Sequence, residues 1–435
     1  MSTIQAQPRL PGSVASSREV FFALPILILI ITLWPNYLLV ASEAGRRAAT
    51  LALIGAVWFV GQRLVLRSPF TGTKTFVLLV GYFVYVLGNL VFNQVLGGGG
   101  VVPGDIAEVL RAGAIVMFYK CGIEAPKTVD LGQVNRATAA FFAIFALLIV
   151  NHLSNLPGVQ DIIQALFTTR RNRFYGSWGS VNYIWVPVST VLFLWLLLRR
   201  GQRPTLVRVL QHAAVLLTSV VGIALSGSRT SMGAVAGGLL IVLAVGSGRV
   251  HHKRSLARGI LRFAGRVLLP IGVVSLATVA IDFLTLSSVV HTRLGELEQI
   301  AQGDLEALPT IAVRQQIWGE AAPTIRERIV FGHGPSKSGI RLLDNSYLMS
   351  VYRYGIVGLL IELGIYFSLL VRYVLLLRGS ATGVRSPIHL YPIVLLLQMM
   401  VSMIPANTFY ELKSPYLLFF IFGFFDSRVQ IVRGG

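Results

Sequence analysis

Residues 354–377 read YGIVGLLIELGIYFSLLVRYVLLL, an apolar run that only Glu362 and Arg372 interrupt with charge. A run of roughly 20 apolar residues is long enough to cross a bilayer as a helix. Similar runs recur along the chain, and overall 54% of its 435 residues are hydrophobic and 13% are charged. The mean hydropathy is +0.70. This composition argues against a water-soluble domain and predicts an integral membrane protein.

Apolar segments bounded by charged residues, Gly or Pro predict about twelve membrane-spanning helices. We expect an all-α polytopic membrane protein with spans near residues 20–40, 48–66, 75–95, 105–120, 137–153, 181–198, 209–226, 231–248, 265–286, 354–377, 388–404 and 415–427. The first run is too long for a signal peptide and lacks a small-residue cleavage site, so we expect it to remain as an anchor. The weakest span is the fourth, which Asp105, Glu108 and Arg111 interrupt.

The basic residues indicate the orientation of the chain. There are 38 Lys and Arg residues against 18 acidic ones, a formal charge of +20. With the N-terminus inside, most basic residues fall in inner loops, as the positive-inside rule requires, and both termini are cytoplasmic. Topology therefore explains the basic excess, and no nucleic-acid partner is expected.

The predicted topology divides the chain into spans 1–9 at 1–286, an outer loop at 287–353 and spans 10–12 at 354–435. The outer loop contains as many acidic as basic residues and is neutral. Helix-like apolar spacing at 294–308 and 311–325 predicts two amphipathic helices, which Pro309 separates.

Most motifs of soluble enzymes are missing from the sequence. There is no phosphate-binding GxxxxGK[ST], no GxSxG and no zinc-binding HExxH. The single cysteine, Cys121, excludes an internal disulfide and a cysteine-based zinc site. We therefore expect neither a metal nor another cofactor.

Three arginines on the predicted outer face are candidates for binding an anion. Arg229 lies in a short Ser-Gly-Ser-Arg-Thr turn, where a guanidinium at the membrane surface favours an anionic partner or extends to water. Arg173 begins an Arg-Phe-Tyr-Gly segment. Arg314 precedes Trp318 by four residues, so both share a helix face, and an ion pair with nearby glutamates is the alternative reading.

Two short segments precede the run at 354–377. Gly332-His-Gly-Pro-Ser336 predicts a turn whose backbone can approach a ligand closely. Asp344-Asn-Ser-Tyr-Leu348 offers a carboxylate and an amide just above the bilayer, although Asp344 could instead cap a helix that starts at Asn345. Glu362 and the group Asp105, Glu108 and Arg111 stay outside this core set, and Glu108 is expected to pair with Arg111.

An ordered set of motifs is similar to the O-antigen ligase and Wzy polymerase superfamily over roughly residues 137–377. The motifs are Arg173-x-x-Gly176-x5-Asn182, Ser228-Arg229, Arg314-x3-Trp318, Gly332-x-Gly334, Asp344-Asn-x-Tyr347-Leu348 and Gly355-x-x-Gly358. The resemblance implies a GT-C-like fold in the bacterial inner membrane with a periplasmic active site. It implies glycan transfer from an undecaprenyl-diphosphate carrier to an acceptor sugar, without a metal. The ligases of the family, and many of its polymerases, carry histidine where this chain has Asp344, and the Asp-Asn version resembles exopolysaccharide polymerases.

The chemistry suits the candidate residues. Negative charge builds on the departing diphosphate, and guanidinium groups stabilise it. We expect Arg229 and Arg314, with Arg173, to hold the diphosphate, and Asn345 and Tyr347 to help bind the glycan. The base that accepts the acceptor hydroxyl proton is Asp344 or, as the competing assignment, His333.

The alternatives are an O-antigen ligase acting on lipid A core and a lipid-linked oligosaccharide flippase or transporter. Transporters usually show duplicated halves and helices that are discontinuous at the membrane midplane, and the sequence indicates neither. Expected partners are the lipid-linked donor, the glycan acceptor, membrane lipids, and a chain-length regulator and flippase of the same pathway.

Overall fold

The computed structural model describes residues 73–98, 100–124, 139–147, 149–150, 184–198, 205–226, 228–247, 309–335, 343–378, 390–406, 408–410 and 414–434. Within these ranges the chain is helical with connecting turns, and no strand occurs among them. The predicted spans at 20–40, 48–66 and 265–286 and the predicted helix at 294–308 lie outside the described residues.

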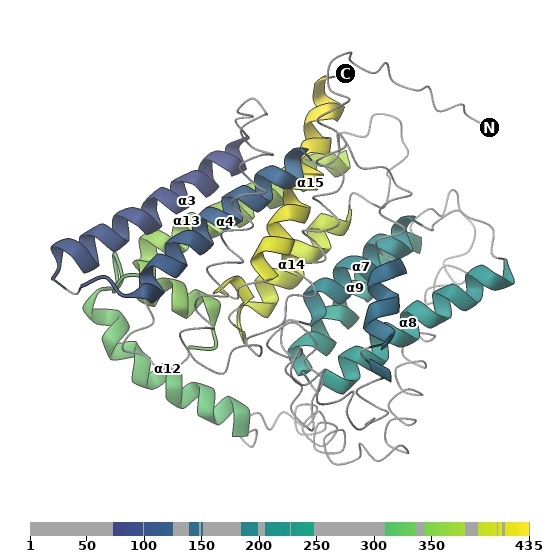
Figure 1. Cartoon of the computed structure of the whole chain (residues 1–435), viewed down its shortest axis with the longest axis horizontal. Helices are drawn as coiled ribbons and strands as arrows, with labels where there is room; N and C mark the ends of the chain where they lie inside the picture. The colour runs from purple at the N-terminus through teal and green to yellow at the C-terminus, as the bar shows by residue number, and fades with distance from the viewer. Residues whose placement is uncertain are drawn as a thin grey trace.

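The described helices coincide with the apolar segments that hydropathy predicts (Figure 1). They are α3 (Lys74–Leu90) with its π-helical continuation η1 (Val91–Leu96), α4 (Pro103–Glu124), α7 (Trp185–Leu198), α8 (Leu206–Ser226), α9 (Arg229–Ser247), α13 (Ser346–Arg378), α14 (Tyr391–Ser402) and α15 (Ser414–Gly434). The segments Lys74–Val95, Val209–Ser226 and Ser346–Leu375 are long and apolar enough to cross a membrane. The protein is thus an all-α membrane protein, and the count of twelve spans and the orientation stay predictions.

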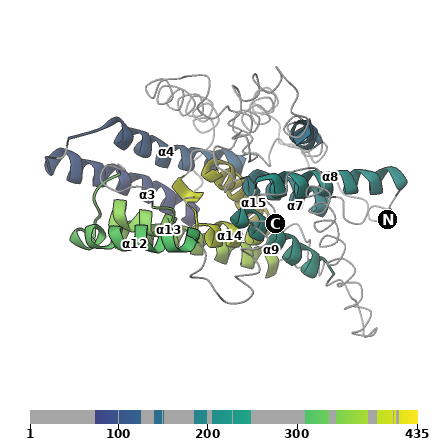
Figure 2. The same ribbon diagram turned by 90° about the horizontal axis from the view of Figure 1, so that it is seen from below.

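The helices form two packed groups. In Figures 1 and 2, α3, α4, α13 and α15 lie together on one side, and α7, α8 and α9 lie on the other. Helix α14 contacts members of both groups and joins them. Its Gln398 side chain hydrogen-bonds to the Ala234 carbonyl of α9, and the Tyr391 hydroxyl donates to the Thr190 carbonyl of α7 at 3.1 Å.

Helices α4 and α15 pack with their backbones in close contact. A Cβ at Gly122 would lie 2.0 Å from the Phe420 carbonyl oxygen, and one at Gly423 would lie 2.0 Å from that of Tyr119. Small residues allow such close approach between membrane helices. Phe118 stacks on Tyr416 beside this contact, with ring centroids 5.0 Å apart. Two glycines therefore bring α4, the helix with the weakest apolar pattern, into the core.

Helix α13 is interrupted near its N-terminal end. Gly355 has φ 67° and ψ −172°, a backbone conformation that is largely confined to glycine. This break lies near the N-terminal end of the helix and does not test the expectation that no helix is discontinuous at the membrane midplane. A lone glycine inside an apolar run also occurs in unbroken helices, so its sequence gives no clear sign of a break. The helix also begins at Ser346, ahead of the predicted start at 354.

The turn containing Gly332 and Gly334 supplies the hydrogen bonds that the break removes. His333 N and Gly334 N donate to the carbonyls of Tyr352 and Arg353 at 2.9 and 3.0 Å. Ile356 N and Val357 N donate in turn to the carbonyls of Ile329 and Val330 at 2.8 and 3.3 Å. Backbone groups without such partners are costly in a bilayer. The segment 329–334 is therefore bonded into the interrupted helix.

Glycine is required on both sides of this contact. A Cβ at Gly332, where φ is 74°, would lie 2.3 Å from the Arg353 carbonyl oxygen. A Cβ at Gly355 would lie 2.0 Å from the Val330 carbonyl oxygen. The two backbones meet only because neither residue has a side chain.

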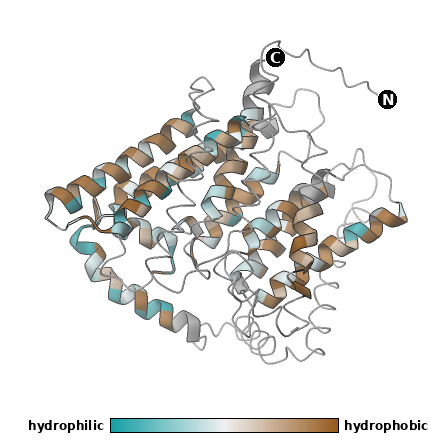
Figure 3. Cartoon of the chain, in the orientation of Figure 1, coloured by the Kyte–Doolittle hydropathy of each residue, from teal (hydrophilic) through white to brown (hydrophobic). Residues whose placement is uncertain are grey.

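Helix α12 (Pro309–Glu327) confirms the amphipathic helix predicted at 311–325. It lies across the end of the group formed by α3, α4 and α13 (Figures 1 and 2). Figure 3 shows more hydrophilic residues along α12 than along α3 or α8. Ala321 and Ile325 are buried against the bundle. This placement brings Arg314 toward the N-terminal end of α13.

Candidate functional site

An ion pair joins α12 to the start of α13. Arg314 Nε lies 3.3 Å from Asp344 Oδ2, and the Arg314 Nη2 group donates to the Pro405 carbonyl at 3.1 Å. The two side chains are 27% and 43% exposed, so both a ligand and solvent can reach them. The structure thus brings two of the predicted site residues together. The partner of Arg314 is this aspartate, and not one of the glutamates near it in sequence.

Asn345 caps α13 and leaves the Asp344 carboxylate available. The Asn345 Oδ1 atom accepts hydrogen bonds from Tyr347 N at 2.9 Å and Leu348 N at 3.0 Å. This is the usual role of an asparagine that precedes the first helical residue. The alternative in which Asp344 caps the helix is therefore not realised.

The segment between α14 and α15 contacts Arg314 and the first residue of α13, two positions after Asp344. Its Pro405 carbonyl binds Arg314, as described above. On the α13 side, Ser346 N donates to the Met403 carbonyl at 2.9 Å, and the Ser346 hydroxyl donates to the Ala406 carbonyl at 2.8 Å. The geometry of Arg314 and Asp344 therefore depends on where residues 403–406 lie.

His333 is held by contacts within the fold. Its Nε2 atom lies 2.7 Å from the Thr324 carbonyl oxygen, and its ring stacks on Tyr352 with centroids 5.0 Å apart. A carbonyl oxygen only accepts hydrogen bonds, so Nε2 carries the proton in this contact. These contacts hold the imidazole ring between α12 and α13.

Of the remaining predicted residues, Tyr347 has a described side chain, whereas the side chains of Arg173 and Arg229 are not described. The Tyr347 hydroxyl donates to the Met400 carbonyl at 2.8 Å, which ties α13 to α14. Arg173 lies outside the described residues, and for Arg229 the structure describes the backbone but not the side chain. Arg229 is the first residue of α9, and the Ser228 hydroxyl caps that helix by accepting from Ser231 N at 3.2 Å.

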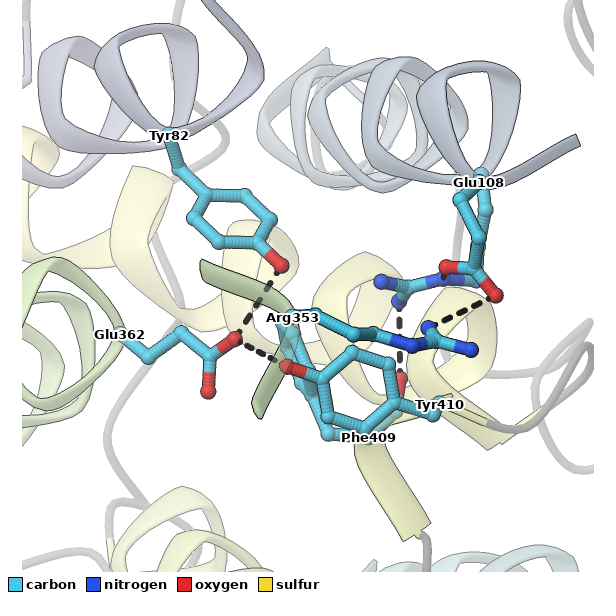
Figure 4. A network of polar contacts seen from close by, with 7 residues as sticks. Tyr82, Glu108, Arg353, Glu362, Phe409 and Tyr410 are labelled. Carbon is cyan, nitrogen blue, oxygen red and sulfur yellow. Dashed lines mark hydrogen bonds and ion pairs between the residues drawn. The ribbon is translucent and has the colours of Figure 1, made fainter. Parts of the chain in front are cut away.

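A buried charged cluster lies between α3, α4, α13 and η5 (Thr408–Tyr410) (Figure 4). Arg111 Nε lies 2.6 Å from Glu108 Oε2, which confirms the predicted pair. Arg353 Nη1 lies 2.9 Å from Glu108 Oε1. Arg353 is 0% exposed, and its guanidinium lies 4.8 Å from the Tyr410 ring centroid. Two arginines from different helices therefore share one carboxylate.

The second carboxylate of the cluster is Glu362. Its Oε1 atom accepts hydrogen bonds from the hydroxyls of Tyr410 at 2.8 Å and Tyr82 at 3.1 Å. Burial raises the pKa of the Tyr410 phenol, with a further increase from the negative charge of Glu362. The phenol therefore keeps its proton at neutral pH and remains a donor to Glu362.

Two guanidiniums and two carboxyl groups make up this cluster. Arg111 Nη1 also donates to the Phe409 carbonyl at 2.9 Å, so the cluster holds both residues of η5 that follow Thr408. In the sequence-based prediction, Glu108, Arg111 and Glu362 lie outside the core site, and Arg353 is the last residue of the outer loop. The cap at Asn345 is the signal that could have placed Arg353 inside the helix.

The site therefore has two parts. An accessible Arg314 and Asp344 pair can bind an anion and accept a proton, and a buried cluster lies behind it. Among the described residues, no group of three His, Cys, Asp or Glu side chains gathers as a metal site.

The fold and the site define a helical membrane protein with a guanidinium and a carboxylate at one end of its bundle. Residues 213–363 match the O-antigen ligase family, and this range contains Arg229, Arg314, His333 and Asp344. This match supports the resemblance of the chain to the O-antigen ligase and Wzy superfamily, whose members are glycosyltransferase-like ligases and polymerases. No curated protein matches the chain.

Proposed function

We propose that this protein is a metal-independent polysaccharide polymerase. It extends a glycan by joining repeat units that are carried on undecaprenyl diphosphate, at the periplasmic face of the bacterial inner membrane. The observation that carries the proposal is the accessible Arg314 and Asp344 pair, 3.3 Å apart, inside the segment that matches the O-antigen ligase family.

The proposed reaction uses the two side chains for different tasks. The bond between the anomeric carbon and the diphosphate oxygen breaks, and negative charge moves onto the diphosphate. Arg314 stabilises that charge as it develops, because a guanidinium binds phosphate oxygens and stays protonated. The acceptor hydroxyl oxygen forms the new bond to the anomeric carbon, and its proton passes to the Asp344 carboxylate.

Arg229 is the second proposed phosphate-binding residue. It occupies the first position of α9. The N-terminus of a helix favours an anion through its free N–H groups and its dipole. A guanidinium at that position adds a full positive charge. Arg173 is proposed as a third contact to the diphosphate, and Asn345 and Tyr347 as neighbours of the glycan.

Asp344 is preferred to His333 as the base. The His333 ring is stacked on Tyr352 and its Nε2 atom is bonded to a backbone carbonyl. Asp344, in contrast, is 43% exposed and is not used as a helix cap. The Asp-Asn pair in place of the histidine of the ligases also supports a polymerase over an O-antigen ligase.

The decisive experiment complements a deletion strain of the native host with Arg314→Gln and Asp344→Asn variants. Both are expected to reach the membrane in normal amount and to leave single repeat units on the carrier. The matched control is Glu320→Gln, which loses only an exposed contact to Gln316 on the same helix. Polymer of normal length from either site variant would refute the assignment.

The same strain separates the candidate functions. A polymerase deletion leaves single units on the carrier, whereas a ligase deletion leaves long polymer that is never transferred to lipid A core. The base is tested with purified enzyme and a lipid-linked repeat unit. Activity that survives Asp344→Asn and is lost in His333→Ala would reverse the base assignment. Glycan lengthening in detergent, where no second compartment exists, would exclude transport as the main activity.

A further inference from the structure

The buried cluster and the accessible ion pair are connected through one short segment. Residues 403–406 bind both Arg314 and Ser346, and the chain reaches η5 within a few residues. In η5, the Phe409 carbonyl accepts from Arg111 at 2.9 Å and the Tyr410 hydroxyl donates to Glu362 at 2.8 Å. The cluster therefore fixes one end of the segment on which the ion pair depends.

Arg353 occupies the centre of this connection. Its guanidinium pairs with Glu108 of α4 and lies over the ring of Tyr410. Its own carbonyl accepts from Gly334 N at 3.0 Å, which ties it to the turn that carries His333. The same residue thus contacts α4, η5 and the turn at 332–335.

Burying these charged groups costs more stability than burying apolar side chains in the same place would. Arg353 Nε, Arg353 Nη2, Arg111 Nη2 and Glu362 Oε2 are buried without a hydrogen-bond partner in the part of the chain that the structure describes. Buried polar groups left in this state lower stability. A hydrophobic contact would hold η5 with a smaller loss of stability. Stability alone therefore does not explain why charged side chains occupy this position.

We propose that Arg353, with Arg111, is a positioning residue for the reaction proposed above. The two guanidiniums do not touch the substrate. They hold η5, and with it residues 403–406, so that the Pro405 carbonyl directs Arg314 toward Asp344. The proposal rests on the proposed function for its kinetic consequence, whereas its structural consequence can be tested without substrate.

The kinetic test compares two arginines of α13 that each pair with a carboxylate of another helix. Arg353→Lys keeps the charge and removes the planar group that pairs with Glu108 over Tyr410. Arg372→Lys makes the same change at the opposite end of the helix, where Arg372 pairs with Asp426. Turnover of a lipid-linked repeat unit is measured per folded molecule, and binding is measured separately with undecaprenyl diphosphate.

Misplacement of a reacting group by about 1 Å can lower a rate by roughly 100-fold. We therefore expect Arg353→Lys to lower turnover by about 10- to 100-fold while the affinity for undecaprenyl diphosphate changes by less than about twofold. Arg372→Lys is expected to retain the wild-type turnover per folded molecule. Equal losses in both variants, or no loss in Arg353→Lys, would overturn the proposal.

A second measurement keeps the proposal testable if the wild-type protein does not turn over the probe. Spin labels are placed at Glu320→Cys on the exposed side of α12 and at Val101→Cys, which is 46% exposed just before α4. The distance distribution between the labels should broaden with Arg353→Lys and stay unchanged with Arg372→Lys. An unchanged distribution in Arg353→Lys would overturn the positioning role, whatever the substrate proves to be.

Discussion

Helix α13 carries an ion pair near each end, and the two pairs are built differently. At one end, Arg353 is 0% exposed and shares Glu108 with Arg111. At the other end, Arg372 is 18% exposed and pairs with Asp426, which also accepts from the Tyr119 hydroxyl. The arginines are separated by about 28 Å along a helix with a rise of 1.5 Å per residue. This separation is close to the thickness of the hydrocarbon core, about 30 Å.

The two ion pairs differ in the kind of backbone that each one connects. The Arg372 pair links α13 to α15 and, through Tyr119, to α4, all of which continue as regular helix there. The Arg353 pair lies beside the break at Gly355 and beside η5, where the chain turns. Similar chemistry thus holds regular helices together at one end and irregular backbone at the other. Irregular backbone is where a membrane protein can present a binding site.

The largest effect on stability is expected from Arg353→Met. Arg353 is fully buried and shares Glu108 with Arg111, and removing one partner from a buried ion pair costs about 3–5 kcal/mol. Arg372→Met should cost less, since Arg372 reaches solvent in part. Thermal unfolding in detergent gives the order of the two variants. Equal losses would mean that the two ends are energetically equivalent.

A second large effect is expected from Gly355→Ala. The backbone conformation at Gly355 is strained for any other residue by about 1–3 kcal/mol, and the new Cβ would meet the Val330 carbonyl oxygen at 2.0 Å. Proteolysis after the substitution should increase within 328–335. Gly364→Ala is the matched control in the same helix, because its Cβ would meet nothing within 4 Å. A neutral Gly355→Ala would show that the break is not required.

A smaller effect is expected when one hydroxyl is removed at each end. Tyr410→Phe removes the hydrogen bond to Glu362, and Tyr119→Phe removes the one to Asp426. A hydrogen bond to a charged group contributes about 1.5–3 kcal/mol, so chemical denaturation should show similar losses. Activity per folded molecule should fall only in Tyr410→Phe. A loss of activity in Tyr119→Phe alone would contradict the assignment of the site to the Arg353 end.

The smallest effect on stability is expected from Arg314→Gln. The pair with Asp344 is partly exposed, and such pairs contribute about 0–1 kcal/mol. The unfolding temperature should therefore stay close to that of the wild type, while the polymerisation assay shows no product. A strongly destabilised variant would indicate that Arg314 holds α12 in place and leave its loss of activity without meaning for the chemistry.

Hydropathy and caps predict most of the described fold because both are local properties. The apolar runs at 75–95, 209–226 and 415–427 each fall within a helical segment, and Pro309 marks the start of α12. The Glu108 and Arg111 pair was predictable for the same reason, since the two residues are three apart on one helix. The Arg314 and Trp318 spacing correctly predicted that both residues lie on one helix, whereas the side of the membrane on which it lies stays a prediction.

The partners of charged residues far apart in sequence were not predictable. Nothing near Arg353 in the sequence predicts that it pairs with Glu108. Hydrophobic periodicity predicts which face of a helix is buried, but not which residue of another helix lies opposite that face. The break at Gly355 was missed because its partner backbone lies in a loop. Asp344 was correctly identified as a carboxylate near the bundle end, but its pairing with Arg314 depends on the position of α12.

The bonding between residues 329–334 and the interrupted helix has a consequence for how the proposed lipid-linked substrate enters. Four backbone hydrogen bonds join this segment to α13 on both sides of Gly355. Lifting the segment away would forfeit them, roughly 2–6 kcal/mol in total. The segment is therefore held in place, and under the proposed function the admission of substrate relies on movement of neighbouring elements, of which α12 is one.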